Sequence, residues 1–520
     1  MRSPRLQETR FCLAAAFAVL VGTTFATAAA QPTVTARIGA PTSATPIPRD
    51  FIGLSVEITN ITPDKTGAYM FRGANQPVID LFRQAGIRNL RVGGGTAEPK
   101  SGDPVKDAAM PVPTHRDIDQ LFAFAKAADV RVIYTLRLLN GSERAAVATA
   151  KYIMDRYAGQ LDCFQIGNEP DWHAYHTYPG HRRDPAIFET VPGEPGSAYP
   201  SYLKQWRKFA AAIRAAVPNA TFGGPDTGSN WPITGGKDTG FRGKSWTVDF
   251  AEDEKGSHYV TQIMPHDYVG QSATGVSVPA AVDAMLSRKW PEVEYAALYQ
   301  RVLAPVQACG LPYRMTECND HTGGVDGASN AFVSALWALD YAHWHAAHHA
   351  IGLNFHNRRW IYTCTIVQEK TGEYRLNPKA YGLRAFNLGS DGRTESLAIT
   401  NPDGINLTGY AVVGPHDHFV TLINKEHGPG ARAVTVTIDA TGARTTPPVE
   451  DDRPHPAGVM FLTAPANEPT ARDDITLGGD TIRADHTWSG KWTAVRPAPS
   501  GTYDVTVAPT SAAIVRIPLN

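Results

Sequence analysis

Short apolar runs alternate with amphipathic segments over most of the chain. Apolar residues recur at helical spacing over residues 77–85, 117–128, 143–157, 202–216, 294–308 and 328–348. Between them lie short β-prone runs at 51–57, 87–92, 130–136, 163–166, 221–224, 261–264, 312–316 and 352–355. Eight strands with intervening helices predict a parallel (β/α)8 barrel, because each parallel strand reaches the next through a crossover helix.

The pattern changes at about Ser396, where the helical period ends. Runs rich in β-branched and aromatic residues at 410–413, 419–423 and 433–438 are separated by Asp, Gly and Pro clusters, which is typical of a β-sandwich. We therefore expect an N-terminal strand within 31–45 that joins the sandwich, a catalytic barrel over 46–390 and a β-sandwich over 391–520.

The first 30 residues have the pattern of a secretory signal peptide. Arg2, Arg5 and Arg10 precede a short apolar stretch at 12–21, and small residues at 26–30 offer cleavage sites. A membrane anchor is the alternative, but the apolar stretch is short for a membrane span. The mature protein is expected to be secreted or periplasmic, with no membrane association after cleavage.

Composition narrows the range of partners. The 520 residues suit one large barrel plus a smaller domain, and a hydrophobic fraction of 42% allows packed cores. Only 19% of residues are charged, and the net charge is -1. No basic face stands out, so we expect no nucleic-acid partner. The oligomeric state is left open.

Two glutamates close predicted strands. Glu169 ends the string Phe-Gln-Ile-Gly-Asn-Glu before Pro170, and Glu317 ends Tyr-Arg-Met-Thr-Glu before Cys318. Parallel-barrel enzymes place catalytic groups at the C-terminal ends of strands, and two facing carboxylates are the minimum for glycoside hydrolysis. The alternative for Glu169 is a structural Glu-Pro pair at a strand end.

Side chains near the glutamates suit a sugar site. Asn168 could hydrogen-bond a sugar hydroxyl, while Tyr268 and Arg91 could stabilise an ionised Glu317. A packing or surface role is an equal alternative for Tyr268 and Arg91. Aromatic and histidine side chains that follow the strands suit stacking on sugars or hydrogen bonding, with core packing as the alternative for the aromatic ones. These are Trp172, Tyr175, His176, Tyr178, His266 and His356. No metal site is expected, because no carboxylate lies at ligand spacing from the histidines.

The two glutamate strings resemble those of clan A retaining glycosidases, and the wider pattern resembles glycoside hydrolase family 79, which contains β-glucuronidases and heparanase-like enzymes. The motifs that carry the resemblance are Gly53–Glu57, Leu90–Gly94, Gln165–Asp171, Thr316–Asn319 and Asn354–His356. The resemblance implies that Glu169 is the acid/base and Glu317 the nucleophile. It also implies that Glu57 contacts hydroxyls of the terminal sugar.

The chain departs from the family pattern at the positions that would hold a sugar carboxylate. Gly323 and Gly324 follow the nucleophile without the tyrosine expected beside them, and Tyr362 is the candidate second tyrosine. Arg358 and Arg359 intervene where glycines are expected. Two arginines could bind a carboxylate through bidentate contacts, or could face solvent.

The sequence therefore predicts a secreted retaining exo-β-glycosidase, specifically a β-glucuronidase, that acts on an oligosaccharide, polysaccharide or glycoside without a cofactor. A retaining mechanism predicts carboxyl groups about 5–5.5 Å apart. Alternatives are the same chemistry on a neutral or modified glycone, or a carbohydrate-binding protein that has lost turnover. An esterase or protease is disfavoured, because the sequence has no G-x-S-x-G motif.

Overall fold

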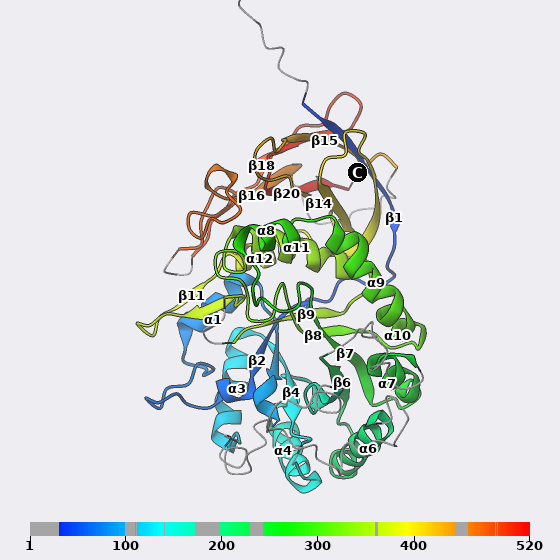
Figure 1. Ribbon diagram of the computed structural model, residues 1–520, viewed down its shortest axis with the longest axis vertical. Helices are drawn as coiled ribbons and strands as arrows, with labels where there is room; N and C mark the ends of the chain where they lie inside the picture. Colours follow the sequence, from blue (N-terminus) through cyan, green and yellow to red (C-terminus); the bar gives the residue numbers. More distant parts are fainter. Residues whose placement is uncertain are drawn as a thin grey trace, which may run out of the picture. The chain divides into compact units, whose positions relative to one another are not determined.

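Eight parallel strands close into a barrel in the computed structural model (Figure 1). The structure describes residues 31–98, 110, 112–139, 141–171, 198–228, 243–358, 362–442, 456–483, 485 and 487–519. The barrel strands are β2 (Ile52–Glu57), β3 (Asn89–Gly93), β4 (Arg131–Leu136), β5 (Leu161–Ile166), β6 (Phe222–Thr227), β7 (Val260–Tyr268), β8 (Arg314–Asn319) and β9 (Gly352–His356). The ring closes because β2 pairs in parallel with both β3 and β9. The predicted (β/α)8 barrel is confirmed.

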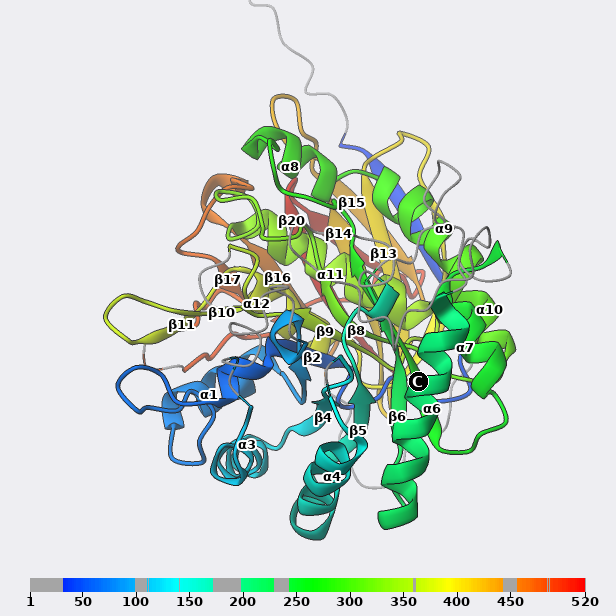
Figure 2. The same ribbon diagram turned by 60° about the horizontal axis from the view of Figure 1, so that its bottom comes forward.

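Helices surround the barrel strands, as Figure 2 shows for the lower half. The α-helices are α1 (Gln76–Ala85), α3 (His115–Ala128), α4 (Glu143–Tyr157), α6 (Ala198–Ala216), α7 (Trp246–Glu254), α8 (Val278–Met285), α9 (Ala296–Leu298), α10 (Ala304–Ala308), α11 (Phe332–Ala347) and α12 (Lys379–Leu388). Short 3-10 turns occupy Ile58–Ile61, Gly95–Ala97 and Pro465–Asn467. Local sequence sets several boundaries: Ser142 caps α4 by accepting from the backbone N–H of Ala145, and Gly86 ends α1 in the left-handed conformation.

Two barrel strands extend further than their apolar runs. We expected strands at 221–224 and 261–264, but β6 continues to Thr227 and β7 to Tyr268. In the sequence, Pro225 and Pro265 predict the ends of these strands, and the polar residues after each proline are typical of a loop. Those residues stay in the strands because their side chains enter a buried polar network at the barrel end, described below.

The expected helix at 294–308 is also irregular. Its segment begins at Trp290 and switches between α-helix and π-helical turns at Trp290–Tyr295 and Tyr299–Leu303. Pro305 lies in the last turns, and a proline inside a helix removes one backbone donor. The spacing of apolar residues predicted the element but not this change of hydrogen bonding.

The C-terminal part of the chain forms a largely antiparallel sheet. Its strand order is β17-β16-β20-β14-β13-β12-β1-β15-β19, with β18 paired to β16. The strands are β1 (Thr33–Pro41), β12 (Arg393–Thr400), β13 (Leu407–Val413), β14 (Asp417–Asn424), β15 (Val434–Asp439), β16 (Gly458–Thr463), β17 (Thr476–Leu477), β18 (Thr493–Ala494), β19 (Tyr503–Val507) and β20 (Ser511–Pro518). The edge strand β19 also contacts β14 and β20, so the sheet curls around one apolar core as a β-sandwich.

The barrel and the sandwich share a hydrophobic core. Ile423, Met460 and Ile514 from the sandwich strands belong to the same buried cluster as the barrel residues. Residues from Pro32 to Asn520 form one compact unit, and β1 lies between β12 and β15. The domain borders at 46–390 and 391–520 stay a prediction.

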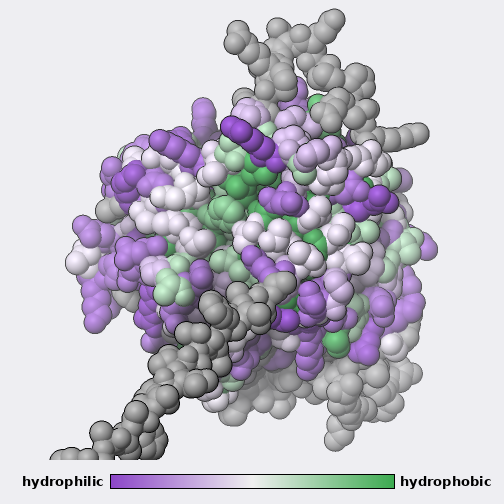
Figure 3. Space-filling view, turned by 90° about the horizontal axis from the view of Figure 1, so that it is seen from above, coloured by the Kyte–Doolittle hydropathy of each residue, from purple (hydrophilic) through white to green (hydrophobic). Residues whose placement is uncertain are grey.

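On the face seen from above, the described surface is mainly hydrophilic (Figure 3). Figure 3, which views the molecule from above, shows polar and charged side chains around a smaller apolar area. Within the described residues, none of the helices combines the length and apolar character that a membrane crossing requires.

A buried ion pair ties the barrel to the sandwich. Lys425 donates to Asp340 of α11 at 3.0 Å, and both side chains are buried. Asp340 also accepts hydrogen bonds from Thr408 and Tyr410 of β13, both at 2.8 Å. These contacts satisfy a carboxylate that burial would otherwise penalise.

We predict that Asp340→Ala lowers the free energy of unfolding by about 3–5 kcal/mol, because Lys425 is left as an unpaired buried charge. Asp155→Ala is the matched control, since it removes an exposed ion pair with Lys151 at 2.9 Å and should cost at most about 0.5 kcal/mol. Urea unfolding measures both. Equal effects of the two substitutions would contradict this account of the interface.

Candidate active site

The two predicted glutamates meet at the C-terminal end of the barrel. Glu317 lies in β8, and Glu169 follows β5, which β6 and β7 separate from β8 in the ring. A carboxylate oxygen of each lies within 4.8 Å of the other. This arrangement leaves space for one reacting centre between the two carboxylates.

Glu317 is held by donors on both of its oxygens. The hydroxyl of Tyr268 donates to Oε1 at 2.7 Å, and Arg91 donates to Oε2 at 2.9 Å. Burial alone would raise the pKa of Glu317, but the charges of His356, His266 and Arg91 outweigh it and hold that pKa well below its usual value. Glu317 is therefore ionised at neutral pH and suited to nucleophilic attack.

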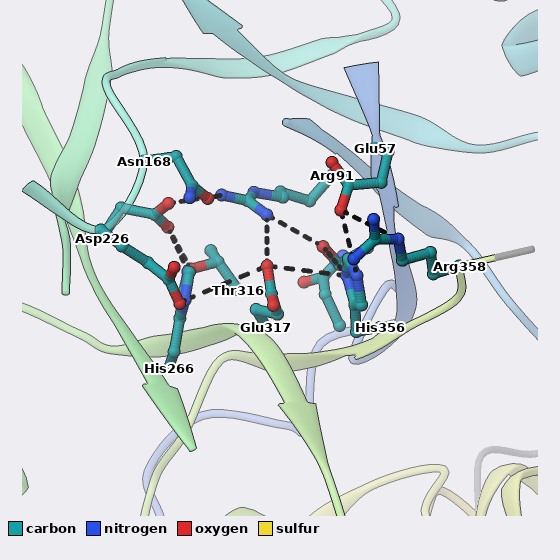
Figure 4. A network of polar contacts seen from close by, with 12 residues as sticks. Glu57, Arg91, Asn168, Asp226, His266, Thr316, Glu317, His356 and Arg358 are labelled. Atoms are coloured by element: carbon teal, nitrogen blue, oxygen red, sulfur yellow. Dashed lines mark hydrogen bonds and ion pairs between the residues drawn. The ribbon is translucent and has the colours of Figure 1, made fainter. Parts of the chain in front are cut away.

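Arg91 is the hub of the network in Figure 4. Its buried guanidinium donates to Glu317, to Asn168 Oδ1 at 2.6 Å and to Asp226. It also donates to the side chains of Gln165 at 3.1 Å and Ser55 at 3.0 Å. Because Arg91 binds groups from both glutamate strands, it fixes their relative position.

Two glycines make room for these groups. A Cβ at Gly93 would lie 2.9 Å from Arg91 Cζ, and a Cβ at Gly94 would lie 2.7 Å from Glu57 Oε2. Gly94 also has a φ of +64°, which favours glycine. Glycine is therefore required at the end of β3 by the side chains packed against it.

Asp226 anchors the second cation of the site. One oxygen of its carboxylate, Oδ1, accepts from Thr316 at 2.6 Å and lies 3.0 Å from His266 Nε2. The other ring nitrogen of His266 lies 3.1 Å from Glu169 Oε1. Burial would lower the pKa of His266, but Asp226 and Glu317 outweigh it and raise this pKa to about 10. His266 is therefore a cation between carboxylates.

Glu169 and Asp226 share an unusual backbone conformation. Their φ angles are +48° and +62°, a region that residues with a Cβ rarely adopt. The backbone N–H of Glu169 donates to the carbonyl of Asp226 at 2.9 Å. Backbone strain of this kind clusters at functional sites, where the surrounding structure holds it in place.

Glu57 lies at the edge of the same network. Its Oε2 accepts from the backbone N–H of Thr96 at 2.6 Å and from the Thr96 hydroxyl at 2.7 Å. Its Oε1 lies 3.7 Å from His356 Nε2 and 3.8 Å from Arg358 Nε. Thr96 thus fixes one oxygen of Glu57 through both its backbone and its hydroxyl.

Asn168 presents a donor that suits a sugar hydroxyl. Its Oδ1 is bound by Arg91, so its amide is oriented. Within the described part of the chain, the buried Nδ2 atom has no hydrogen-bond partner. A buried donor of this kind gains from an acceptor on a bound ligand.

The structure gathers only some of the predicted carboxylate binders. Arg358 reaches Glu57 with an exposed side chain, whereas Tyr362 is 45% exposed and its backbone N–H donates to the Gly323 carbonyl at 3.3 Å. Gly323 and Gly324 form the turn below Tyr362, both with positive φ. Several predictions lie outside the described residues, namely those for Arg359, Trp172, Tyr175, His176 and Tyr178 and the signal peptide at 1–30.

Sequence reasoning missed Asp226 and Lys379. The expected strand ended at Gly224, which left Asp226 in a loop, although a carboxylate two residues later at a strand end was a usable signal. Lys379 is fully buried in α12 and donates to Asn319 Oδ1 at 2.7 Å and to the Thr363 carbonyl at 2.6 Å. No motif around Lys379 in the sequence predicts that this lysine is buried against the end of β8.

A metal ion fits the central cluster poorly. Glu169, His266 and Glu317 place ligand atoms within 4.8 Å of one another. However, both nitrogens of His266 face carboxylates and its pKa of about 10 keeps it protonated. The guanidinium of Arg91 also binds Glu317. A protonated imidazole cannot ligate a cation, and two fixed positive charges oppose one.

Solved structures similar to the chain are barrel glycoside hydrolases. A 4-O-α-L-rhamnosyl-β-D-glucuronidase from Fusarium oxysporum 12S is 16% identical with a TM-score of 0.66, covering 93% of this chain and 100% of that one. A GH51 arabinofuranosidase from Xanthomonas axonopodis pv. citri is 13% identical with a TM-score of 0.61, covering 94% and 99%. CelM2, a bifunctional glucanase-xylanase from a metagenome library, is 13% identical with a TM-score of 0.59, covering 94% and 100%.

No family model matches the chain, and no curated protein matches it either. At these identities the similarity establishes the fold, a TIM barrel with a C-terminal sandwich of the kind found in clan A glycosidases.

We predict that Asp226→Asn lowers the pKa of His266 from about 10, because the carboxylate is the main group that raises it. The raised pKa of His266 stabilises the fold fully below about pH 6.5, and this contribution disappears as the pH rises to about 10. The variant should therefore be less stable than wild type mainly below about pH 6.5, and the difference should shrink at higher pH. Imidazole 15N NMR measures the titration. Asp283→Asn is the control, because Asp283 pairs with His427 at 2.9 Å on the surface. An unchanged His266 titration in Asp226→Asn would refute this role.

Proposed function

We propose that the protein is a secreted retaining exo-β-glycosidase of the family 79 type, specifically a β-glucuronidase. The observation that carries the retaining mechanism is that one carboxylate oxygen of Glu169 and one of Glu317 lie within 4.8 Å of each other. Retaining enzymes have carboxyl groups about 5–5.5 Å apart, whereas inverting enzymes need about 6.5–9.5 Å for an intervening water. The N-terminal pattern of residues 1–30 supports secretion.

In the first step, the ionised Glu317 would attack the anomeric carbon while Glu169 protonates the leaving oxygen. Tyr268 and Arg91 orient the attacking carboxylate through one oxygen each. Attack converts the Glu317 carboxylate into a neutral glycosyl ester, and Glu169 becomes a carboxylate as its proton passes to the leaving oxygen. Asn168 is placed to bind a sugar hydroxyl through Nδ2, an interaction that can strengthen in the transition state.

In the second step, Glu169 would act as a base and take a proton from water, which attacks the same anomeric carbon. The glycosyl ester breaks, Glu317 returns to its carboxylate form and the sugar leaves with retained configuration. His266 lies 3.1 Å from Glu169 and 4.0 Å from Glu317. As a fixed cation it can compensate the charge that moves between the two carboxylates.

Arg358 supports the uronic-acid specificity. It is exposed at the edge of the site and lies 3.8 Å from Glu57, so its guanidinium can reach a sugar carboxylate near that residue. Arginine binds carboxylates through two parallel hydrogen bonds. From the sequence, Arg359 and Tyr362 are the further candidates for binding this carboxylate.

One observation favours a second candidate, the same mechanism on a neutral glycone. Glu57 is a buried carboxylate beside Arg358. It would repel a uronate carboxylate placed against it, whereas it would accept hydrogen bonds from neutral sugar hydroxyls. The two candidates differ only in whether Arg358 turns from Glu57 toward the substrate.

We predict that wild type hydrolyses p-nitrophenyl β-glucuronide faster than p-nitrophenyl β-glucoside. Glu317→Ala should lower turnover by at least about 1,000-fold, because it removes the nucleophile. Glu292→Ala is the control, since Glu292 is an exposed carboxylate paired with Arg288 on the surface. Release of p-nitrophenol measures all three proteins.

Faster hydrolysis of the glucoside would keep the mechanism and reject the uronic-acid specificity. Equal loss in Glu317→Ala and Glu292→Ala would reject the assignment of Glu317. A folded wild type that hydrolyses neither substrate would reject the β-glucuronidase proposal and favour the binding-protein alternative.

A further inference from the structure

A second hollow lies on the same face of the barrel as the two glutamates. Its volume is about 1060 Å³. Three segments line it: residues 64–81, which follow β2; residues 366–381, which follow β9 and comprise the hairpin of β10 (Ile366–Gln368) and β11 (Tyr374–Leu376) and the start of α12; and residues 472–483 of the sandwich. Because β2 and β9 are adjacent in the barrel, the loops after them neighbour each other at its C-terminal end. We call this hollow the hairpin groove; Figure 1 shows β11 beside α1 at its wall.

The hairpin is fixed to the catalytic centre. Asn357 follows the site residue His356 directly in the chain. Its Oδ1 accepts from the backbone N–H groups of Thr365 and Ile366 at 2.9 and 2.8 Å, and its own backbone N–H donates to the Ser55 carbonyl at 2.7 Å. A ligand in the groove is thus held at a constant position relative to the glutamates.

Aromatic rings with fixed orientations line the groove. The hydroxyl of Tyr69 donates to Asp117 at 2.8 Å, and the hydroxyl of Tyr381 accepts from the backbone N–H of Ile482 at 2.8 Å. Tyr374 lies half-buried on the hairpin. Rigid aromatic faces bind ring ligands with little loss of side-chain entropy.

The charges that line the groove do not favour an anionic ligand. Five acidic residues and four arginines line it. Arg375 pairs with Glu369, Arg472 with Asp326, and Arg483 with Asp480. With three arginines already neutralised, the groove has no net attraction for an anionic chain, but it offers many donors and acceptors for hydroxyl groups.

We propose that the hairpin groove binds neutral sugar units of the chain that carries the cleaved residue. This inference rests on the proposed function, since it assigns the groove to the same substrate. Single small ligands occupy pockets of about 300–1,000 Å³, so the groove has room for several rings. The specificity of the enzyme would then combine a terminal sugar at the glutamates with a neutral chain beside the hairpin.

The test is binding of neutral hexasaccharides of glucose, xylose and galactose, with a hexasaccharide of galacturonate as the acidic comparison, measured by calorimetry. We expect wild type to bind at least one neutral hexasaccharide and Tyr374→Ala to bind it at least about tenfold more weakly, the loss expected for one stacking ring. Tyr374→Phe should keep the affinity, because the ring remains. Tyr503→Ala is the control, since Tyr503 is also half-buried but lies on β19 of the sandwich.

Failure to bind any neutral hexasaccharide, tighter binding of the galacturonate chain, or equal affinity in wild type and Tyr374→Ala would each overturn the proposal. Hydrolysis of p-nitrophenyl β-glucuronide by the same preparations separates it from the proposed function. Hydrolysis without hexasaccharide binding rejects the groove alone, whereas hexasaccharide binding without hydrolysis rejects the β-glucuronidase and keeps the groove.

Discussion

The guanidinium of Arg91 is the interaction on which the site depends. It is fully buried in the middle of β3 and donates to groups from β2, β5, β6 and β8. A buried charge is tolerated only when it is paired and hydrogen-bonded. At this end of the barrel, carboxylates and neutral acceptors from four strands satisfy the guanidinium. Asp226 and Glu317 balance the charge of Arg91 and of His266, and the network leaves Glu317 ionised. The same contacts that make the buried arginine tolerable therefore keep Glu317 in the ionised form that its proposed role as nucleophile requires.

The rest of the structure holds this network in place. Lys379 links α12 to the end of β8 and to Thr363, and Asn357 joins β9, β2 and the β10–β11 hairpin. The sandwich packs on the barrel through a shared core and the Asp340–Lys425 pair. Polar contacts thus hold the end of the barrel that carries the site, while the shared core and one ion pair hold the barrel against the sandwich.

Much of the fold followed from periodicity, because barrel strands buried on both faces form apolar runs that are easy to separate from amphipathic helices. Glu169 and Glu317 could be found because each closes such a run. Asp226, His266 and Tyr268 belong to strands that continue past a proline into polar residues, and an apolar pattern ends too early there. Their strand conformation depends on partners from distant strands, which a local pattern does not contain.

The substrate side was harder to predict for a similar reason. Arg358 and Tyr362 are exposed residues of one loop, and neither burial nor spacing distinguishes a ligand contact from a solvent contact. The structure separates them by their contacts, since Arg358 lies 3.8 Å from Glu57 whereas the backbone N–H of Tyr362 donates to the Gly323 carbonyl. The hairpin groove has no motif, because segments from three distant parts of the chain form it.

The central claim is that Glu317 forms a covalent bond to the sugar. The direct measurement is mass spectrometry of the peptides of the protein after incubation with an activated 2-deoxy-2-fluoro-β-glucuronide, which slows release of a glycosyl ester. The account predicts one fluoroglycosyl group, carried by the peptide that contains Glu317. Turnover of the reagent with inversion and no label, or a label on a different carboxylate, would contradict it.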